Sequence, residues 1–319
     1  MAEDNQSPKP SAPAVPPETQ FPEFPGDYLS PSFAERVHAV LVGPEGLRPG
    51  WRILVYLFLV VVLFLLSQVI LGSLHNLGLL RLMFLDKVLF VLAVSLPALF
   101  LARMEQRPFS AYGLSARGLM RANVWAGALW GCGAFSLLIL VLVAVGAYEP
   151  GPISAHGRRM ALFAIFWAAF FVLVALSEEF LLRGYTLYTL TEAMGFWPAA
   201  VLLSLTFGGI HAANRGESAM GILGAAAIGF FFCLTLRRTG DLWFAVGFHA
   251  SWDWFESYVY SVPDSGSVAP GRLLHPSLHG SPWITGGTVG PEGSLFLILV
   301  MAVVWFAFSR VYRVAKYPA

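Results

Sequence analysis

Charge is scarce in this sequence of 319 residues. Only 12% of the residues are charged, whereas 57% are hydrophobic and the mean hydropathy is +0.67. A soluble globular domain has roughly twice that share of charged residues, so the composition excludes one and indicates a chain whose solvent is lipid. The net charge of +1 comes without any basic stretch, which removes the electrostatic case for binding nucleic acid.

Cysteine is also scarce, and a signal-peptide pattern is missing. Cys132 and Cys233 both lie in apolar runs, where a thiol behaves as a small hydrophobe, so no disulfide framework is implied. The first residues lack the basic-then-apolar order of a cleavable signal peptide. Residues 1–50 are instead rich in Pro and polar groups, and we expect a disordered cytoplasmic tail with a short interfacial helix in FAERVHAVLVG.

Long apolar runs fill the rest of the chain. A membrane-spanning helix needs about 20 mostly apolar residues. Eight stretches meet or approach that length: 53–74, 86–102, 122–147, 160–182, 197–213, 219–236, 241–262 and 294–310. We therefore predict an all-α polytopic membrane bundle of about eight transmembrane helices in residues 51–319, with its motif core in residues 160–262.

The Lys and Arg residues are distributed unequally between the two sides of this predicted topology. With a cytoplasmic N-terminus, fourteen of them lie on inside-facing segments and six on the opposite side. The positive-inside rule then favours two cytoplasmic termini in a multi-pass protein of the cell membrane, which we expect to be a bacterial inner membrane. The Gly-, Pro- and Ser-rich loop 263–293 would face outside.

Ionisable residues within apolar segments are functional candidates, because burying them in a membrane is costly. The first cluster is Ser177-Glu178-Glu179-Phe180-Leu181-Leu182-Arg183. On a helix, Glu179 and Arg183 share a face and can form an ion pair, whereas Glu178 points about 100° away and stays free. Such an ion pair is equally typical of a structural clamp between helices.

Two further clusters follow in the next apolar segments. His211 ends the run Phe207-Gly208-Gly209-Ile210-His211 and precedes Asn214, while His249 and Asp253 are four residues apart on one helix face. A single His in an apolar helix is often only a packing residue. One free Glu, two His and one Asp on three interior helices are costly without partners, however, and we expect them to converge on one site.

Such a set of side chains suits hydrolysis of an amide bond. A carboxylate in a partly dry site can act as a general base, a His can orient the attacked water, and other polar groups can stabilise the oxyanion. The sequence has no Ser nucleophile elbow, no Cys beside a His and no H-E-x-x-H motif. Water activated by Glu178 is the remaining option.

The three clusters in this order resemble the motifs of the CAAX-protease and bacteriocin-processing family. The resemblance covers about residues 175–260. It rests on Glu178-Glu179-x-x-x-Arg183, Phe207-x-x-x-His211 and His249-x-x-x-Asp253, with further similarity at Gly184, Asn214, Gly224, Trp252 and the turn Arg238-Thr239-Gly240-Asp241-Leu242-Trp243.

The resemblance implies a helical bundle with a conical cavity that opens to the membrane and to one aqueous side. It also implies that Glu178 activates water with help from His211, that Glu179 and Arg183 hold the arrangement, and that His249 and residue 253 stabilise the oxyanion. Many members have Asn where this chain has Asp253. An ionised Asp cannot donate a hydrogen bond, so the resemblance does not fix the role of this residue.

The sequence does not decide whether a metal ion takes part in catalysis. Glu178, His211 and His249 could supply three ligands to a catalytic zinc ion, but they have no diagnostic ligand spacing. We therefore expect metal-free water activation, with zinc as the alternative. His275 and His279 lie in the long loop, and we expect them to be exposed residues with no ligand role.

The favoured function is an intramembrane endopeptidase that acts on a prenylated or otherwise membrane-anchored peptide or protein, in contact with membrane lipid. A proton-coupled transporter is an alternative, because intramembrane Glu, His and Asp also build proton relays. A non-catalytic scaffold or immunity protein is another. Counting residues along the predicted helices places Glu178 and His211 at different depths in the bilayer. The depths agree if the fourth helix continues to about Met194 and this pair of helices shifts relative to the bilayer.

Overall fold

The computed structural model describes residues 32–44, 46–119, 122–154, 156–214 and 216–317. Residues 1–31 of the predicted disordered tail lie outside the described residues. The helices are α1 (Phe33–Leu41), α2 (Pro49–Ser73), α3 (Leu79–Met104), α4 (Ala116–Leu119), α5 (Asn123–Ala144), α6 (Gly157–Glu179), α7 (Leu187–Met194), α8 (Phe196–His211), α9 (Ala219–Thr239), α10 (Trp243–Trp254), α11 (Pro282–Thr285) and α12 (Leu295–Val311).

Short elements complete the chain. The 3-10 turns are η1 (His75–Leu77), η2 (Phe109–Tyr112) and η5 (Pro291–Gly293), and the π-helical segments are η3 (Phe180–Thr186) and η4 (Phe255–Val259). Two-residue strands form two antiparallel pairs, β1 (Val42–Gly43) with β2 (Gly46–Leu47) and β3 (Tyr148–Glu149) with β4 (Ser277–Leu278).

The prediction of an all-α polytopic membrane bundle is confirmed. In the described part of the chain, five helical segments are long and apolar enough to cross a bilayer: α2, α3, α5, the continuous stretch from α6 to α7, and α9. α8 and α12 are shorter apolar helices. Together with α10, which continues into η4, these elements match the eight apolar stretches of the sequence.

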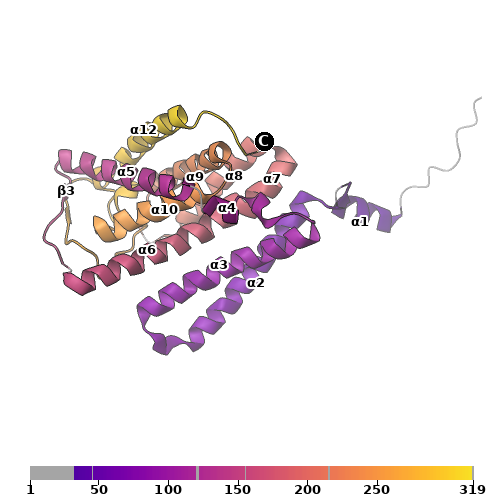
Figure 1. Cartoon of the computed structure of the whole chain (residues 1–319), viewed down its shortest axis with the longest axis horizontal. Helices are drawn as coiled ribbons and strands as arrows, with labels where there is room; N and C mark the ends of the chain where they lie inside the picture. The colour runs from indigo at the N-terminus through magenta and orange to yellow at the C-terminus, as the bar shows by residue number, and fades with distance from the viewer. Residues whose placement is uncertain (1–31, 45, 120–121, 155, 215, 318–319) are drawn as a thin grey trace, which may run out of the picture.

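Figure 1 shows how the helices are arranged. α2 and α3 form an antiparallel hairpin along one edge, and α6 lies between that hairpin and the group formed by α5, α10, α9 and α12. α1 extends away from the bundle, and none of its residues is buried. The predicted short helix is therefore present, and Ser32 and Glu35 form a capping box at its start.

Two apolar clusters hold the bundle together. One joins α5, α9, α10 and α12 around aromatic side chains that include Phe135, Phe231, Phe248 and Phe308. The other joins α2, α3, α8 and α9 to the segment that follows α6. Small residues allow the first cluster to close, because a Cβ atom on Gly131 of α5 would overlap the Phe248 carbonyl oxygen of α10.

The fourth apolar segment continues beyond Glu179, as equal depth of the site residues requires. η3 and α7 extend it to Met194, and after Gly195 the chain reverses into α8. Glu178 lies seventeen residues before Gly195 and His211 sixteen residues after it. Gly184 interrupts the helical winding between Glu178 and Gly195, but the Glu178 and His211 side chains line the same cavity.

The long loop 263–293 folds back onto the bundle. Its strand β4 pairs with β3 at the end of α5, and the Trp167 indole of α6 donates to the Pro270 carbonyl oxygen at 3.0 Å. Ser154 donates to the Arg272 carbonyl oxygen at 2.6 Å. These contacts attach the loop to the α5–α6 connection and place it over one end of α10.

Candidate active site

A cavity of about 440 Å³ lies between α3, α6, α8, α9, α10 and the long loop. Aromatic side chains contribute to its lining, among them Phe90, Phe170, Phe171 and Phe232. Polar and ionisable side chains also line it: Glu178, His211, Asn214, Glu217, His249, Asp253, Ser257, Asp264, Ser265 and Glu292. The cavity therefore combines apolar surface that suits a lipid chain with a cluster of ionisable groups.

The two adjacent glutamates of α6 lie in opposite environments. The Glu178 side chain is 31% exposed and lines the cavity, whereas the Glu179 and Arg183 side chains are fully buried. Arg183 Nη1 donates to Glu179 Oε1 at 3.2 Å, so the ion pair expected from their spacing is present. The Arg183 guanidinium also lies 4.5 Å from the centre of the Phe207 ring, a cation–π contact.

His249 connects both glutamates to Asp253. Its Nδ1 lies 3.0 Å from Glu179 Oε1, and its Nε2 lies 3.5 Å from Asp253 Oδ2 and 3.9 Å from Glu178 Oε2. The ring stacks on Phe232. Because the Glu179 carboxylate is paired with Arg183 and can only accept, Nδ1 carries a hydrogen and Nε2 faces the cavity.

His211 is oriented by its own helix. Its Nδ1 lies 2.8 Å from the Phe207 carbonyl oxygen, one turn earlier in α8. A carbonyl oxygen can only accept, so Nδ1 carries the hydrogen and Nε2 of the neutral ring is an acceptor. Phe207 therefore positions two site residues, with its ring on Arg183 and its carbonyl group on His211.

Two of the three helices that carry site residues, α6 and α10, change to π-helical winding close to those residues. η3 follows Glu179 and contains Gly184, whose backbone angles of φ −83° and ψ −112° are not helical. η4 follows Asp253 by two residues. π-helical turns recur at functional sites, because the wider turn changes the direction of the side chains that follow it.

The structure brings the predicted site residues together in two layers. Glu178, His211, His249 and Asp253 line the cavity, and Glu179 and Arg183 lie behind His249. Within the described residues, the structure does not place ligand atoms of Glu178, His211 and His249 all within 4.8 Å of one another. In the long loop, His275 and His279 are exposed, as expected.

Sequence reasoning missed four carboxylates near this site. Glu217 precedes α9, Asp264 and Glu292 come from the long loop, and all three line the cavity, whereas Glu256 is buried in η4. A signal for Glu256 was present, because it is an ionisable residue within an apolar segment. Asp264 and Glu292 lie in a Gly-, Pro- and Ser-rich stretch, where an acidic residue is normally solvated, so no sequence signal distinguishes them from ordinary loop residues.

Residues 160–255 match the family model of type II CAAX prenyl endopeptidase Rce1-like proteins. The matched segment runs from α6 to the first residue of η4 and contains all six predicted site residues. This match confirms the resemblance inferred from the three motifs.

The family match supports a CAAX-type endopeptidase kind of function for a multi-pass membrane protein, with a peptide or protein substrate at the membrane. Comparisons with the curated proteins and with the solved structures found no significant match.

Proposed function

We propose that this chain is an intramembrane endopeptidase that hydrolyses peptide bonds at or within the membrane, using water activated by Glu178. One observation carries the assignment of the base. Of two adjacent carboxylates, Glu179 is buried against Arg183 and His249, whereas Glu178 is exposed to the cavity and paired with no Lys or Arg in the described part of the chain. Only Glu178 is free to accept a proton from water.

Glu178 and His211 orient the water in this mechanism. The Glu178 carboxylate takes one proton from the water as its oxygen attacks the carbonyl carbon of the scissile peptide bond. His211 Nε2 accepts the second hydrogen of that water, because Nδ1 is already donating to the Phe207 carbonyl oxygen. The carbonyl π bond opens, and a tetrahedral intermediate with a negative oxygen forms.

His249 stabilises the negative oxygen. With Nδ1–H held by Glu179, a doubly protonated ring offers Nε2–H to the oxyanion from a position already fixed before reaction. Asp253, 3.5 Å from Nε2, balances the charge of that ring. This gives an ionised Asp253 a role that does not require it to donate a hydrogen bond.

Collapse of the intermediate breaks the C–N bond. The proton held by Glu178 goes to the leaving nitrogen, so the products are a carboxylic acid and an amine, and the carboxylate of Glu178 is restored. No covalent enzyme intermediate is needed. We propose no metal for this step, with zinc held by Glu178, His211 and His249 as the alternative.

We propose a membrane-anchored substrate, prenylated or bearing another lipid-like segment. The aromatic residues of the cavity lining, including Phe170 and Phe171, suit an apolar chain, and the carboxylates and histidines line the same cavity. A lipid-anchored peptide could therefore place its anchor among the aromatic rings and its polypeptide near Glu178. The CAAX-type family match is consistent with such a substrate.

The test compares membrane peptides from cells that produce wild-type protein, Glu178→Ala or Glu149→Gln. Glu149→Gln is the matched control, because it also removes a carboxylate but lies on β3 with a 72% exposed side chain. We expect a set of uncut precursors to accumulate only with Glu178→Ala. Purified wild-type protein should then cut a synthetic lipidated peptide based on such a precursor. Identical peptide sets in all three strains would contradict the proposed activity.

A further inference from the structure

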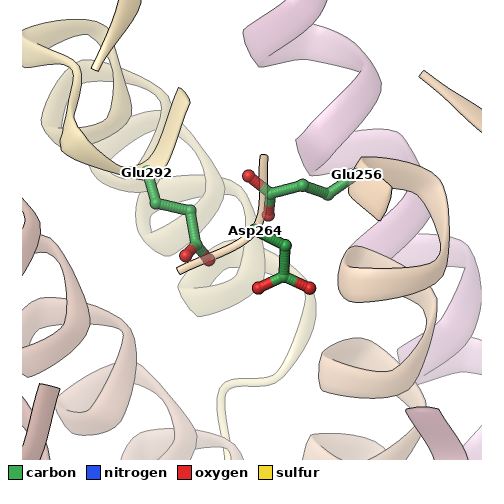
Figure 2. Close-up of side chains that lie close together, drawn as sticks. All are labelled: Glu256, Asp264 and Glu292. Carbon is green, nitrogen blue, oxygen red and sulfur yellow. The ribbon is translucent and has the colours of Figure 1, made fainter. Parts of the chain in front are cut away.

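A second group of carboxylates lies beside the proposed catalytic residues. Glu256 comes from η4, Asp264 from the long loop and Glu292 from η5, so three separate segments of the chain converge there. One carboxylate oxygen from each residue can be chosen so that all three lie within 4.8 Å of one another. Figure 2 shows the three side chains approaching one another from their different segments.

Glu256 gives an independent reason to expect a ligand. Its side chain is fully buried, and neither carboxylate oxygen has a hydrogen-bond partner in the described part of the chain. Within the same residues, no Lys or Arg forms an ion pair with Glu256, Asp264 or Glu292. A buried carboxylate without partners is costly, and a cation bound among the three groups would remove that cost.

The other two carboxylates are held by hydrogen-bond donors. Ser257 Oγ donates to Asp264 Oδ2 at 2.8 Å, and the Trp252 indole nitrogen donates to Glu292 Oε1 at 3.0 Å. Ser265 Oγ donates to Glu292 Oε2 at 3.3 Å. Such outer hydrogen bonds are typical of carboxylates that ligate metals, because they fix the direction of the ligand atoms.

We propose that Glu256, Asp264 and Glu292 bind a divalent cation of the calcium class. The three ligands offer only oxygen atoms, which hard cations prefer over zinc or copper. Three protein carboxylates around one ion suit Ca²⁺, because Ca²⁺ takes six to eight oxygen ligands in flexible geometry. Mg²⁺ loses its water reluctantly and is usually held by only one or two carboxylates.

The bound cation would connect the end of α10 to the long loop. Glu256 directly continues the helix that carries His249 and Asp253, while Asp264 and Glu292 belong to the loop that lines one side of the cavity. Asp264 and Glu292 line the cavity, so an ion can reach the site through it. The inference concerns a structural cation and does not depend on which residue activates water.

Terbium luminescence tests the site directly, because Tb³⁺ replaces Ca²⁺ at oxygen ligands and is excited through nearby tryptophan. Trp252 donates a hydrogen bond to Glu292, so it is the tryptophan that can excite a bound Tb³⁺ ion. Full-length protein in detergent would be stripped with EGTA and titrated with Tb³⁺. We expect one saturable site from which Ca²⁺ displaces Tb³⁺ more effectively than Mg²⁺ does, with at least tenfold weaker binding in Glu256→Gln and Glu292→Gln.

Two control variants test whether the Tb³⁺ luminescence comes from this carboxylate cluster. Glu149→Gln and Glu178→Gln should bind Tb³⁺ as the wild-type protein does, because neither residue belongs to the cluster. A wild-type protein without a saturable Ca²⁺-displaceable signal would overturn the proposal. Equal binding by Glu256→Gln and the wild-type protein would also overturn it.

Thermal melting gives a second readout that needs no catalysis. Ca²⁺ at a hundredfold excess over its Kd should raise the melting temperature of the wild-type protein by roughly 5 °C. In EGTA, Glu256→Gln should melt at or above the wild-type temperature, because it lacks the unpaired buried charge, and Ca²⁺ should no longer shift it. A wild-type melting temperature unaffected by Ca²⁺ would show that the carboxylates share protons instead, and the proposal would be wrong.

Discussion

At the scale of single residues, Glu178 and Glu179 are chemically identical but structurally distinct. One lines the cavity and the other is buried between Arg183 and His249. Replacing Glu178 with isosteric Gln removes the proposed base but keeps the shape of the side chain. We expect Glu178→Gln to melt at or above the wild-type temperature and to cut turnover by at least about a hundredfold, as measured by detergent melting and peptide cleavage.

Glu179 provides the matched comparison for this prediction. Glu179→Ala leaves the buried Arg183 without its carboxylate, which costs about 3 to 5 kcal/mol when a buried ion pair is broken. This variant should therefore lose folded protein as well as activity. Near-normal cleavage by Glu178→Gln would show that another group is the base. Failure of Glu178→Gln to fold, with Glu179→Gln tolerated, would mean that the two residues exchange roles.

Catalysis by Glu178 without zinc gives a second prediction at this scale. Peptide cleavage should survive 1,10-phenanthroline, which removes zinc but leaves Ca²⁺ and Mg²⁺ in place. Its non-chelating isomer, 1,7-phenanthroline, is the control. Cleavage that is lost in the chelator and restored by added zinc would instead make His211 and His249 ligands, and the metal-free mechanism would be wrong.

The site residues themselves differ in how far the sequence could predict them. The i,i+4 spacing was enough to pair Glu179 with Arg183, because helix geometry fixes which side chains share a face. The contact of His249 with Glu179 joins residues seventy positions apart, and helix periodicity does not encode it. Asp264 and Glu292 could be assigned to the site only from the folded structure of the long loop.

At the scale of helices, the close approach of α5 and α10 depends on glycine. A Cβ on Gly131 would overlap the Phe248 backbone, which cannot move aside as a flexible side chain could. Gly131→Ala should therefore lower the melting temperature, at a cost of about 1 to 3 kcal/mol for overpacking. Because α10 carries His249, we also expect lower peptide-cleavage activity.

Gly133 supplies the control on the same helix. No atom lies within 4 Å of a Cβ built at Gly133, so alanine there meets open space. Gly133→Ala should keep wild-type activity and stability, or gain slightly from the better helix propensity of alanine. Equal effects of the two substitutions would show that contact between α5 and α10 does not limit stability.

Helix positions followed from apolar length, because a bilayer requires long apolar segments and internally paired backbone groups. The change from α-helical to π-helical winding within a segment could not be predicted from apolar length. The π-helical segments η3 and η4 lie in apolar stretches whose composition also suits an α-helix. They depend on packing between helices, and that packing is set by residues far away in the sequence.

At the scale of the whole molecule, orientation in the membrane remains a proposal based on the distribution of Lys and Arg. We predict that both termini face the cytoplasm. A fluorescent protein that matures only in the cytoplasm, fused after Ala319, should fluoresce, whereas alkaline phosphatase fused there should be inactive. Active phosphatase without fluorescence would reverse the topology.

The cavity itself affects how the purified protein will behave. Its aromatic lining residues, which include Phe90, Phe170 and Phe171, suit an alkyl chain of a detergent as well as the anchor of a substrate. Detergent would then act as a competitive inhibitor, and the apparent KM for a lipidated peptide should rise with detergent concentration while kcat stays constant. Assays with detergents of different chain length but one headgroup would measure this, and longer chains should compete more strongly.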